Sequence, residues 1–166
     1  MSLQHLQVPV IAKVQGIATA AGCQLVAQCD LAVASSEAKF AVSGVNLGLF
    51  CATPSVALSR NLSRKAAFEM LVTGDFISAT EALSKGLINK VAEPEDLDTA
   101  VESLVNKIVS KPQVALAMGK ALFYKQLETG MVQAYDDASQ TMACNMMAAP
   151  ALEGVQAFLE KRKPNW

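Results

Sequence analysis

Residues 8–35 have the sequence VPVIAKVQGIATAAGCQLVAQCDLAVAS, and this stretch decides the fold. The apolar, β-branched run at 8–14 predicts a buried strand. Small residues at 17–23 predict a turn that leads into a short helix at 24–28, and a second apolar strand is expected at 31–35. The order of strand, turn, helix and strand favours an α/β crossover unit whose strands pair mainly in parallel.

The rest of the chain has mostly helical patterning. Pro54 is expected in the first turn of one helix, and Gly74 is expected to end the next. Ser78 and Glu81 have the spacing of a capping box, in which each side chain satisfies an unpaired backbone N–H, and Gly86 is expected to close that helix. Also expected are a short strand at 87–91, a helix opened by 94–96, and apolar helical stripes at Leu97, Val101, Leu104, Val105 and Ile108, at Val114, Ala117, Met118, Ala121 and Leu122, and at Leu152, Val155, Phe158 and Leu159.

The composition excludes several classes of function. Of the 166 residues 52% are apolar and 17% are charged, with a formal net charge of −1. The charged fraction is well below the roughly 25% that is typical of soluble domains, so this chain is expected to be ordered around a large apolar core. A near-neutral charge, no long basic run and few aromatic residues argue against a nucleic-acid partner. A membrane span needs roughly 18 consecutive apolar residues, which the sequence lacks, so none is expected.

Cysteine and histidine usage narrows the chemistry. Cys23, Cys29, Cys51 and Cys144 form no CxxC pair, so they are expected to be reduced, buried, structural thiols. His5 is the single histidine and lies in a terminal segment, which excludes HExxH-type sites, and no metal site is expected. The opening residues have neither a basic start nor an apolar stretch, so no targeting segment is expected in this chain.

The small-residue turn is the most informative candidate for a site. Ala20, Ala21 and Gly22 stand where a helix is expected to begin, so their backbone N–H groups lack intrahelical acceptors. Such N–H groups can bind a carbonyl oxygen that becomes negative during a reaction, which is the arrangement of an oxyanion hole. The alternative interpretation is that small residues merely allow tight packing of the helix on a strand.

Four segments, taken together, resemble the enoyl-CoA hydratase/isomerase (crotonase) family: PVIAKVQG at 9–16, AAGCQL at 20–25 with Cys-Asp at 29–30, TGDFISA at 73–79 and FLEKRK at 158–163. They occur in the family's order and extend over nearly the whole chain from Pro9 onward. The resemblance implies an α/β fold of repeated β-β-α turns forming a spiral, of which residues 1–92 would be the C-terminal part. It also implies a helical region at 93–166 that mediates trimer packing.

The resemblance also implies the substrate class, acyl-CoA thioesters, with no other cofactor bound. It assigns Ala21 one backbone N–H of the carbonyl-binding pair, with Ala20 and Gly22 beside it, and it places the second N–H in an earlier loop that these 166 residues do not contain. The two glutamates of family hydratases match Gln24 and Gly44. Glutamine has no exchangeable proton near neutral pH and glycine has no side chain, so ordinary water addition is not expected.

Two further positions carry expectations from the resemblance. Lys161 matches a lysine that contacts CoA phosphate or adenine, sometimes from a neighbouring subunit. A basic residue at the end of a helix is also favoured by the helix dipole, and this alternative stays open. Met142 matches an aromatic contact to adenine, with a place in the apolar core as its alternative.

The remaining acidic residues are expected to be structural. Asp30 and Asp75 match family positions in turns and caps. Asp136 and Asp137 are expected on solvated helix faces. Ala52 stands where some relatives carry an acidic group and is chemically inert.

These observations favour a crotonase-family acyl-CoA-binding protein linked to fatty-acid metabolism, with a degenerate acid/base site, and leave open whether it is an enzyme. The alternative is a non-catalytic, shortened form that acts as an oligomerisation or interaction module. An unrelated α/β domain without a ligand is the third possibility. The resemblance implies a homotrimer or hexamer, possibly with full-length subunits, and a mitochondrial location.

Overall fold

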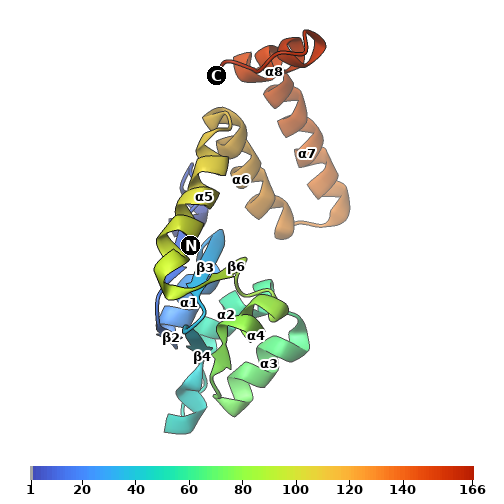
Figure 1. Cartoon of the computed structure of the whole chain (residues 1–166). Helices are drawn as coiled ribbons and strands as arrows, with labels where there is room; N and C mark the ends of the chain where they lie inside the picture. Colours follow the sequence, from blue (N-terminus) through green and yellow to red (C-terminus); the bar gives the residue numbers. More distant parts are fainter. Residues whose placement is uncertain (1) are drawn as a thin grey trace. The chain divides into compact units, whose positions relative to one another are not determined.

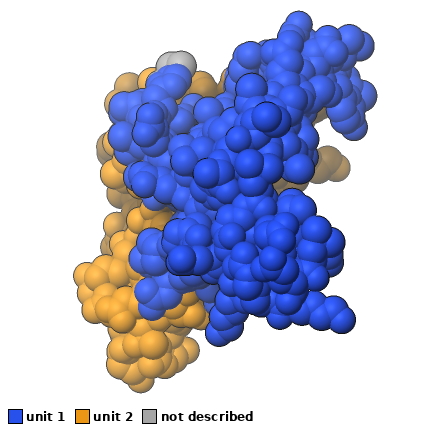
Figure 2. Space-filling model, turned by 90° about the horizontal axis from the view of Figure 1, so that it is seen from above, with its two compact units in different colours: residues 1–9, 105–166 blue, residues 10–104 orange. Residues whose placement is uncertain are grey.

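The computed structural model describes residues 2–166, and its elements divide into a mixed α/β part and a helical part (Figure 1). Residues 10–104 form one compact unit, called here the sheet unit. Residues 2–9 and 105–166 belong to a second, the helical unit; Figure 2 colours the two units separately.

The sheet unit contains two three-stranded sheets. One has the order β1 (Ile11–Val14), β3 (Leu31–Ser35) and β6 (Lys90–Ala92), and the other has the order β2 (Ile17–Thr19), β4 (Lys39–Ala41) and β5 (Ile77–Ser78). All neighbours pair in parallel except β4 and β5. From β1 to β4, successive strands alternate between the two sheets, so each of the first two β-β units adds one strand to each sheet; β5 then joins β4 in the second sheet, and β6 returns to the first. The expected parallel crossover of the strands at 8–14 and 31–35 is confirmed by β1 and β3.

The helices of the sheet unit are α1 (Ala21–Gln28), α2 (Ala52–Asn61), α3 (Arg64–Thr73) and α4 (Ala79–Lys85), and α5 (Leu97–Val109) begins in it. Their ends confirm the expected signals. The Glu81 N–H donates to Ser78 Oγ at 3.2 Å while the Ser78 N–H donates to Glu81 Oε2 at 2.8 Å. Gly74 and Gly86 end their helices with left-handed φ values of 67° and 86°.

The core of the sheet unit is rich in alanine, which lets helices approach the strands closely. Its largest fully buried side chains include Phe40, Leu58 and Met70. A smaller cluster packs Leu97 and Ala100 of α5 against Val33 of β3. This burial is the main source of stability for the unit.

Four expected boundaries are wrong. The strand expected to be buried at 8–14 begins only at Ile11 and is mostly half-buried, with Lys13 exposed. Residues 17–19 form the strand β2 rather than part of a turn, because Ala18 is buried and β2 pairs with β4. The helix expected at 24–28 already begins at Ala21. In the segment 87–91, Leu87 and Ile88 are buried after α4, but strand pairing begins only at Lys90.

The helical unit comprises a 3₁₀ turn (Ser2–His5) and the helices α6 (Gln113–Leu127), α7 (Met131–Met146) and α8 (Ala149–Leu159). Lys120 of α6 is buried and donates from Nζ to the carbonyl oxygens of Leu3 and Val8, both at 2.9 Å. This tie holds the N-terminal segment on α6. No helix within residues 2–166 combines the length and the apolar character that crossing a membrane requires.

Candidate functional site

The turn between β2 and α1 has an unusual backbone. Ala20 has φ 49° and ψ −116°, a conformation that glycine adopts readily and alanine does not. Both of its backbone groups are used: its N–H donates to the Ala41 carbonyl at 3.0 Å, and its carbonyl accepts from the Gln24 N–H at 3.0 Å. The turn is therefore fixed on one side to β4 and on the other to the first turn of α1.

Ala21 and Gly22 begin α1 and are exposed. The first N–H groups of a helix have no intrahelical acceptor, and within residues 2–166 no side chain caps this helix or places an acid in its first turn. A Cβ built on Gly22 would meet nothing within 4 Å, so tight packing does not explain glycine at this position. The arrangement can accept an electron-rich oxygen at the positive end of the helix.

Gly44 lies in a 3₁₀ turn (Ser43–Leu47), and the segment that follows this turn leaves no room for a side chain at position 44. A Cβ at this position would stand 2.6 Å from the Leu49 carbonyl oxygen and 2.7 Å from Cys51 Sγ. The Gly44 N–H also donates to Cys51 Sγ at 3.3 Å. Gln24, the other position matched to a glutamate, is half-buried on α1 and has a full side chain.

A pair of hydroxyl groups lies beside this turn, and the sequence analysis did not single it out. Thr19 Oγ1 and Ser43 Oγ are 3.2 Å apart, which joins the end of β2 to the residue before Gly44. The adjacency of Thr19 to the small-residue turn was the only signal in the sequence.

Met142 and Lys161 lie in the helical unit, whereas Ala20, Ala21, Gly22 and Gln24 belong to the sheet unit. The Met142 side chain on α7 is 61% exposed, so its place in an apolar core of this chain is wrong. Lys161 follows α8 with a left-handed φ of 54°, and its N–H donates to the Phe158 carbonyl at 3.2 Å. The next N–H, of Arg162, donates to the Ala157 carbonyl at 3.0 Å. This is the bonding pattern of a Schellman motif, with lysine where glycine is usual.

Comparison with known proteins now decides the family. The family model described as enoyl-CoA hydratase/isomerase matches residues 1–166. The chain belongs to the enoyl-CoA hydratase/isomerase family. The two-sheet spiral of β-β-α turns is the expected crotonase-like fold, which is confirmed by the solved relatives below.

Among curated relatives of this family, the chain is 51% identical over 166 residues to the rat and the human enoyl-CoA hydratase domain-containing protein 3, mitochondrial. Each match covers the whole chain but 55% of the relative, so the chain spans about half the length of these relatives. A crystal structure of an enoyl-CoA hydratase from Mycobacterium smegmatis superposes with a TM-score of 0.98 at 66% identity, covering 99% of this chain and 64% of that one. The human domain-containing protein 3 superposes with a TM-score of 0.96 at 51% identity, covering 100% and 66%.

The cysteines of this family member are free thiols in different surroundings. Burial raises the pKa of Cys23 to about 12, and proximity to Cys51 adds to the rise, so Cys23 stays a neutral thiol at physiological pH. Cys29 and Cys51 are half-buried and Cys144 on α7 is exposed, so the expectation that the cysteines are buried holds for Cys23 alone. The helix α7 presents the face of Cys144 to solvent rather than to the core.

The acidic residues also need one correction. Asp30 has a structural role, since its Oδ2 accepts from the Val10 N–H at 2.6 Å. Asp137 is buried, not solvated, and binds Lys125 Nζ at 2.8 Å between α6 and α7. The hydrogen bond from Lys125 lowers the pKa of Asp137. No cluster of three metal-ligating His, Cys, Asp or Glu side chains is present in the described part of the chain.

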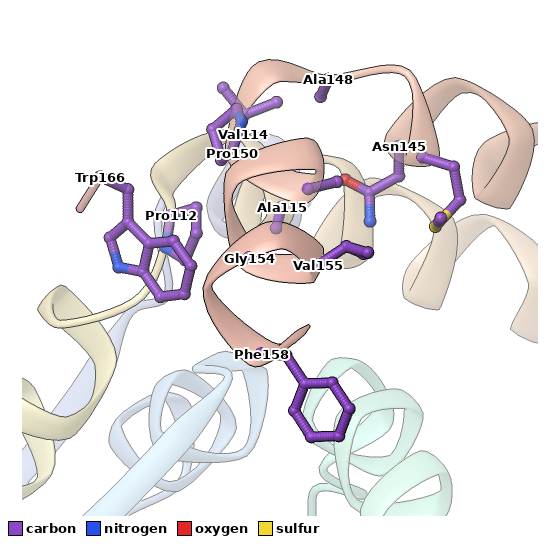
Figure 3. Close-up of a pocket in the computed structure, with 12 residues that line it drawn as sticks. Pro112, Val114, Ala115, Asn145, Ala148, Pro150, Gly154, Val155, Phe158 and Trp166 are labelled. Atoms are coloured by element: carbon purple, nitrogen blue, oxygen red, sulfur yellow. The ribbon is translucent and has the colours of Figure 1, made fainter. Parts of the chain in front are cut away.

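A pocket of about 390 Å³ lies within the helical unit, lined by residues of α6, α7 and α8 and by the C-terminal Trp166 (Figure 3). Its walls are apolar, with Asn145 as the polar side chain among the aliphatic and aromatic ones. Trp166 is fixed there, because its Nε1 donates to the Ser110 carbonyl at 2.9 Å and Gly154 leaves room for its ring. Neither Met142 nor Lys161 lines this pocket.

Proposed function

We propose that this chain binds acyl-CoA thioesters at the turn of Ala20, Ala21 and Gly22. The observation that carries the proposal is the exposed start of α1 at Ala21, where the N–H has no intrahelical acceptor. A thioester carbonyl oxygen is an acceptor that gains negative charge when its α or β carbon reacts, and a fixed N–H donor stabilises that charge. Gly22 contributes open space beside the backbone, in which the acyl group can lie.

We also propose that the acid/base part of the site is degenerate and that ordinary hydration does not occur. A hydratase needs groups that take a proton from water and deliver one to carbon. Gln24 can donate and accept hydrogen bonds but exchanges no proton near neutral pH. At Gly44 a glutamate would have to displace the Leu49 carbonyl and the Cys51 sulfur, which a Cβ would approach to 2.6 and 2.7 Å.

For the CoA portion of the ligand we propose contacts with two residues of the helical unit. Lys161 is exposed and carries a positive charge that suits a phosphate, and Met142 offers an exposed, polarisable side chain for the adenine ring.

Binding and turnover test the proposal separately. Calorimetric titration with butyryl-CoA is expected to give a micromolar Kd, about 8 kcal/mol of binding free energy, whereas crotonyl-CoA is not hydrated above the buffer rate. Gln24→Ala should leave the affinity within a few-fold of the parent, and Gln113→Ala, at an exposed glutamine that begins α6, is the matched control. Robust hydration that Gln24→Ala abolishes, with Gln113→Ala unaffected, would contradict the proposal.

A second candidate function is assembly through the helical unit. The unit exposes large apolar side chains, among them Val132 at 80% and Phe158 at 82%. Exposed apolar surface on this scale is typical of subunit interfaces. We propose a homotrimer or hexamer formed through α6, α7 and α8, in which full-length subunits of the family could also take part.

Sedimentation measurements decide between the two candidates. A trimer that Val132→Glu dissociates, in a chain that binds no acyl-CoA, supports a pure interaction module. A monomer that melts cooperatively and binds butyryl-CoA with micromolar affinity counts against that module. Assembly together with binding supports both functions.

Location and pathway are proposed from the relatives alone. The rat and human relatives carry "mitochondrial" in their names, and we propose a mitochondrial location linked to fatty-acid metabolism if the source cell has mitochondria. A fluorescent fusion that stays outside mitochondria in such a cell would contradict it. The relative from Mycobacterium smegmatis, at 66% identity, comes from a bacterium, so the family is not confined to that compartment.

A further inference from the structure

The conformation of Ala20 requires something that holds it. Within residues 2–166 the non-glycine residues with positive φ are Ala20 and Lys161. For alanine at φ 49° and ψ −116° the Cβ crowds the neighbouring backbone, and such conformations persist only where surrounding contacts over-determine them. Ala20 immediately precedes the N–H to which the proposed function assigns the thioester carbonyl.

The contacts around Ala20 tie the end of β2 to the end of β4 and to the segment that follows β4. The register pairs Thr19 with Ala41, and the Ala20 N–H donates to the carbonyl of that same Ala41 at 3.0 Å. Two residues further on, Ser43 Oγ lies 3.2 Å from Thr19 Oγ1. The backbone bond can form with any residue at these positions, so the hydroxyl pair is the sequence-specific part of the tie.

We propose that Thr19 and Ser43 are positioning residues whose hydrogen bond holds Ala20 in its strained conformation and so directs the Ala21 N–H toward the thioester carbonyl. The peptide plane between Ala20 and Ala21 turns with the ψ angle of Ala20. If Ala20 relaxes to negative φ, that plane rotates and the Ala21 N–H loses its direction. The inference rests on the proposed function, because it explains how the carbonyl-binding donor is fixed.

The test compares two ligands that differ by the carbonyl oxygen. Butyryl-CoA carries the thioester, whereas S-butyl-CoA is the thioether of the same length. The parent chain is expected to prefer the thioester by about fivefold, the effect of one neutral hydrogen bond. Thr19→Val keeps the shape of the side chain and removes the hydroxyl, and it should abolish the preference while S-butyl-CoA binds as before. Ser43→Ala should do the same, and Thr80→Val, at an exposed threonine of α4, should change neither affinity.

A rescue separates positioning from general damage. Glycine adopts the Ala20 conformation without steric strain, so it does not need the hydroxyl tie. The double variant Thr19→Val with Ala20→Gly should therefore recover most of the thioester preference. Preference retained in Thr19→Val, or no recovery in a double variant that folds like the parent, overturns the proposal.

A measurement without ligand keeps the inference separate from the proposed function. If the parent chain binds neither CoA derivative or shows no preference, the proposed function fails, and the positioning role is then judged on stability. The fall in Tm caused by Thr19→Val should be clearly larger in the Ala20→Gly background than in the parent, because in the parent the relaxation of Ala20 releases its strain and offsets part of the lost hydrogen bond, whereas glycine has no strain to release. If Thr19→Val lowers Tm equally in the two backgrounds, the positioning role is overturned, even if the chain binds acyl-CoA as proposed.

Discussion

Replacing Gly44 by alanine should destabilise the protein strongly, because the backbone at this position encloses the space of the new methyl group. The Cβ would stand 2.6 Å from the Leu49 carbonyl oxygen and 2.7 Å from Cys51 Sγ. Neither atom is free to withdraw. The Leu49 N–H donates to the Gly44 carbonyl at 2.9 Å, and Cys51 Sγ accepts the Gly44 N–H at 3.3 Å.

The magnitude follows from two contributions. Forcing a methyl group into a closed site costs about 1–3 kcal/mol. Breaking one of the hydrogen bonds that close the turn adds about 1 kcal/mol. The free energy of unfolding should therefore fall by about 3 kcal/mol, which for a chain of this length lowers Tm by roughly 10 °C.

Urea denaturation followed by circular dichroism measures this loss. Gly119→Ala on α6 is the matched control, because nothing lies within 4 Å of its Cβ and alanine raises helix propensity by up to about 1 kcal/mol. Adding Cys51→Ala to Gly44→Ala removes the sulfur contact but not the Leu49 contact, so it should recover only part of the loss. A Gly44→Ala variant within about 0.5 kcal/mol of the parent would refute the reasoning, since that is the range of neutral surface changes.

Three further predictions concern other parts of the chain. Hydrogen bonds, chiefly from Arg162, lower the pKa of Glu153 from 4.5 to about 2. These hydrogen bonds stabilise the C-terminal segment fully above pH about 4.5, and the stabilisation is lost as the pH falls toward about 2. The fluorescence of the single tryptophan should report this loss, and Glu153→Gln should remove the pH dependence. Lys161→Gly should raise Tm and Lys161→Ala should not, because only glycine adopts the left-handed conformation at this position without steric strain. Both variants should weaken CoA binding equally if the Lys161 ammonium group contacts phosphate. In thiol labelling of the native chain Cys144 should react first, and Cys23 only upon unfolding.

Sequence patterns predicted those features whose physical cause lies within a few residues. The capping box of Ser78 and Glu81 is complete within four positions, and the left-handed helix ends need only glycine at 74 and 86. The strand β3 was equally accessible, because burial on both faces of a parallel strand gives a continuous apolar run. The strand β1 was found from its β-branched residues, although Lys13 in it is exposed and only Val14 is buried.

The features that the sequence did not reveal depend on partners far along the chain. Residues 17–19 form a strand only because β4 lies beside them in the fold. Asp137 has the pattern of a solvated helix face, yet Lys125 of the preceding helix pairs with it at 2.8 Å and the helices bury it. The thiol of Cys51 that fills the space at Gly44 follows seven residues later, and no local rule connects the two.

The two halves of a hydratase site therefore depend on different properties of the chain. Binding a carbonyl oxygen needs a backbone N–H in a fixed direction, which alanine supplies at Ala21 as well as glycine does, provided that Ala20 is held in its conformation. Moving a proton needs a side chain and the room for it. At Gly44 both are absent, because the turn has closed over the position with a carbonyl and a thiol. A carboxylate introduced at Gln24 could not act together with one at Gly44 unless the whole segment 44–51 were rebuilt. For that reason the carbonyl binding that we propose at the turn of Ala20, Ala21 and Gly22 can be tested independently of any acid/base chemistry.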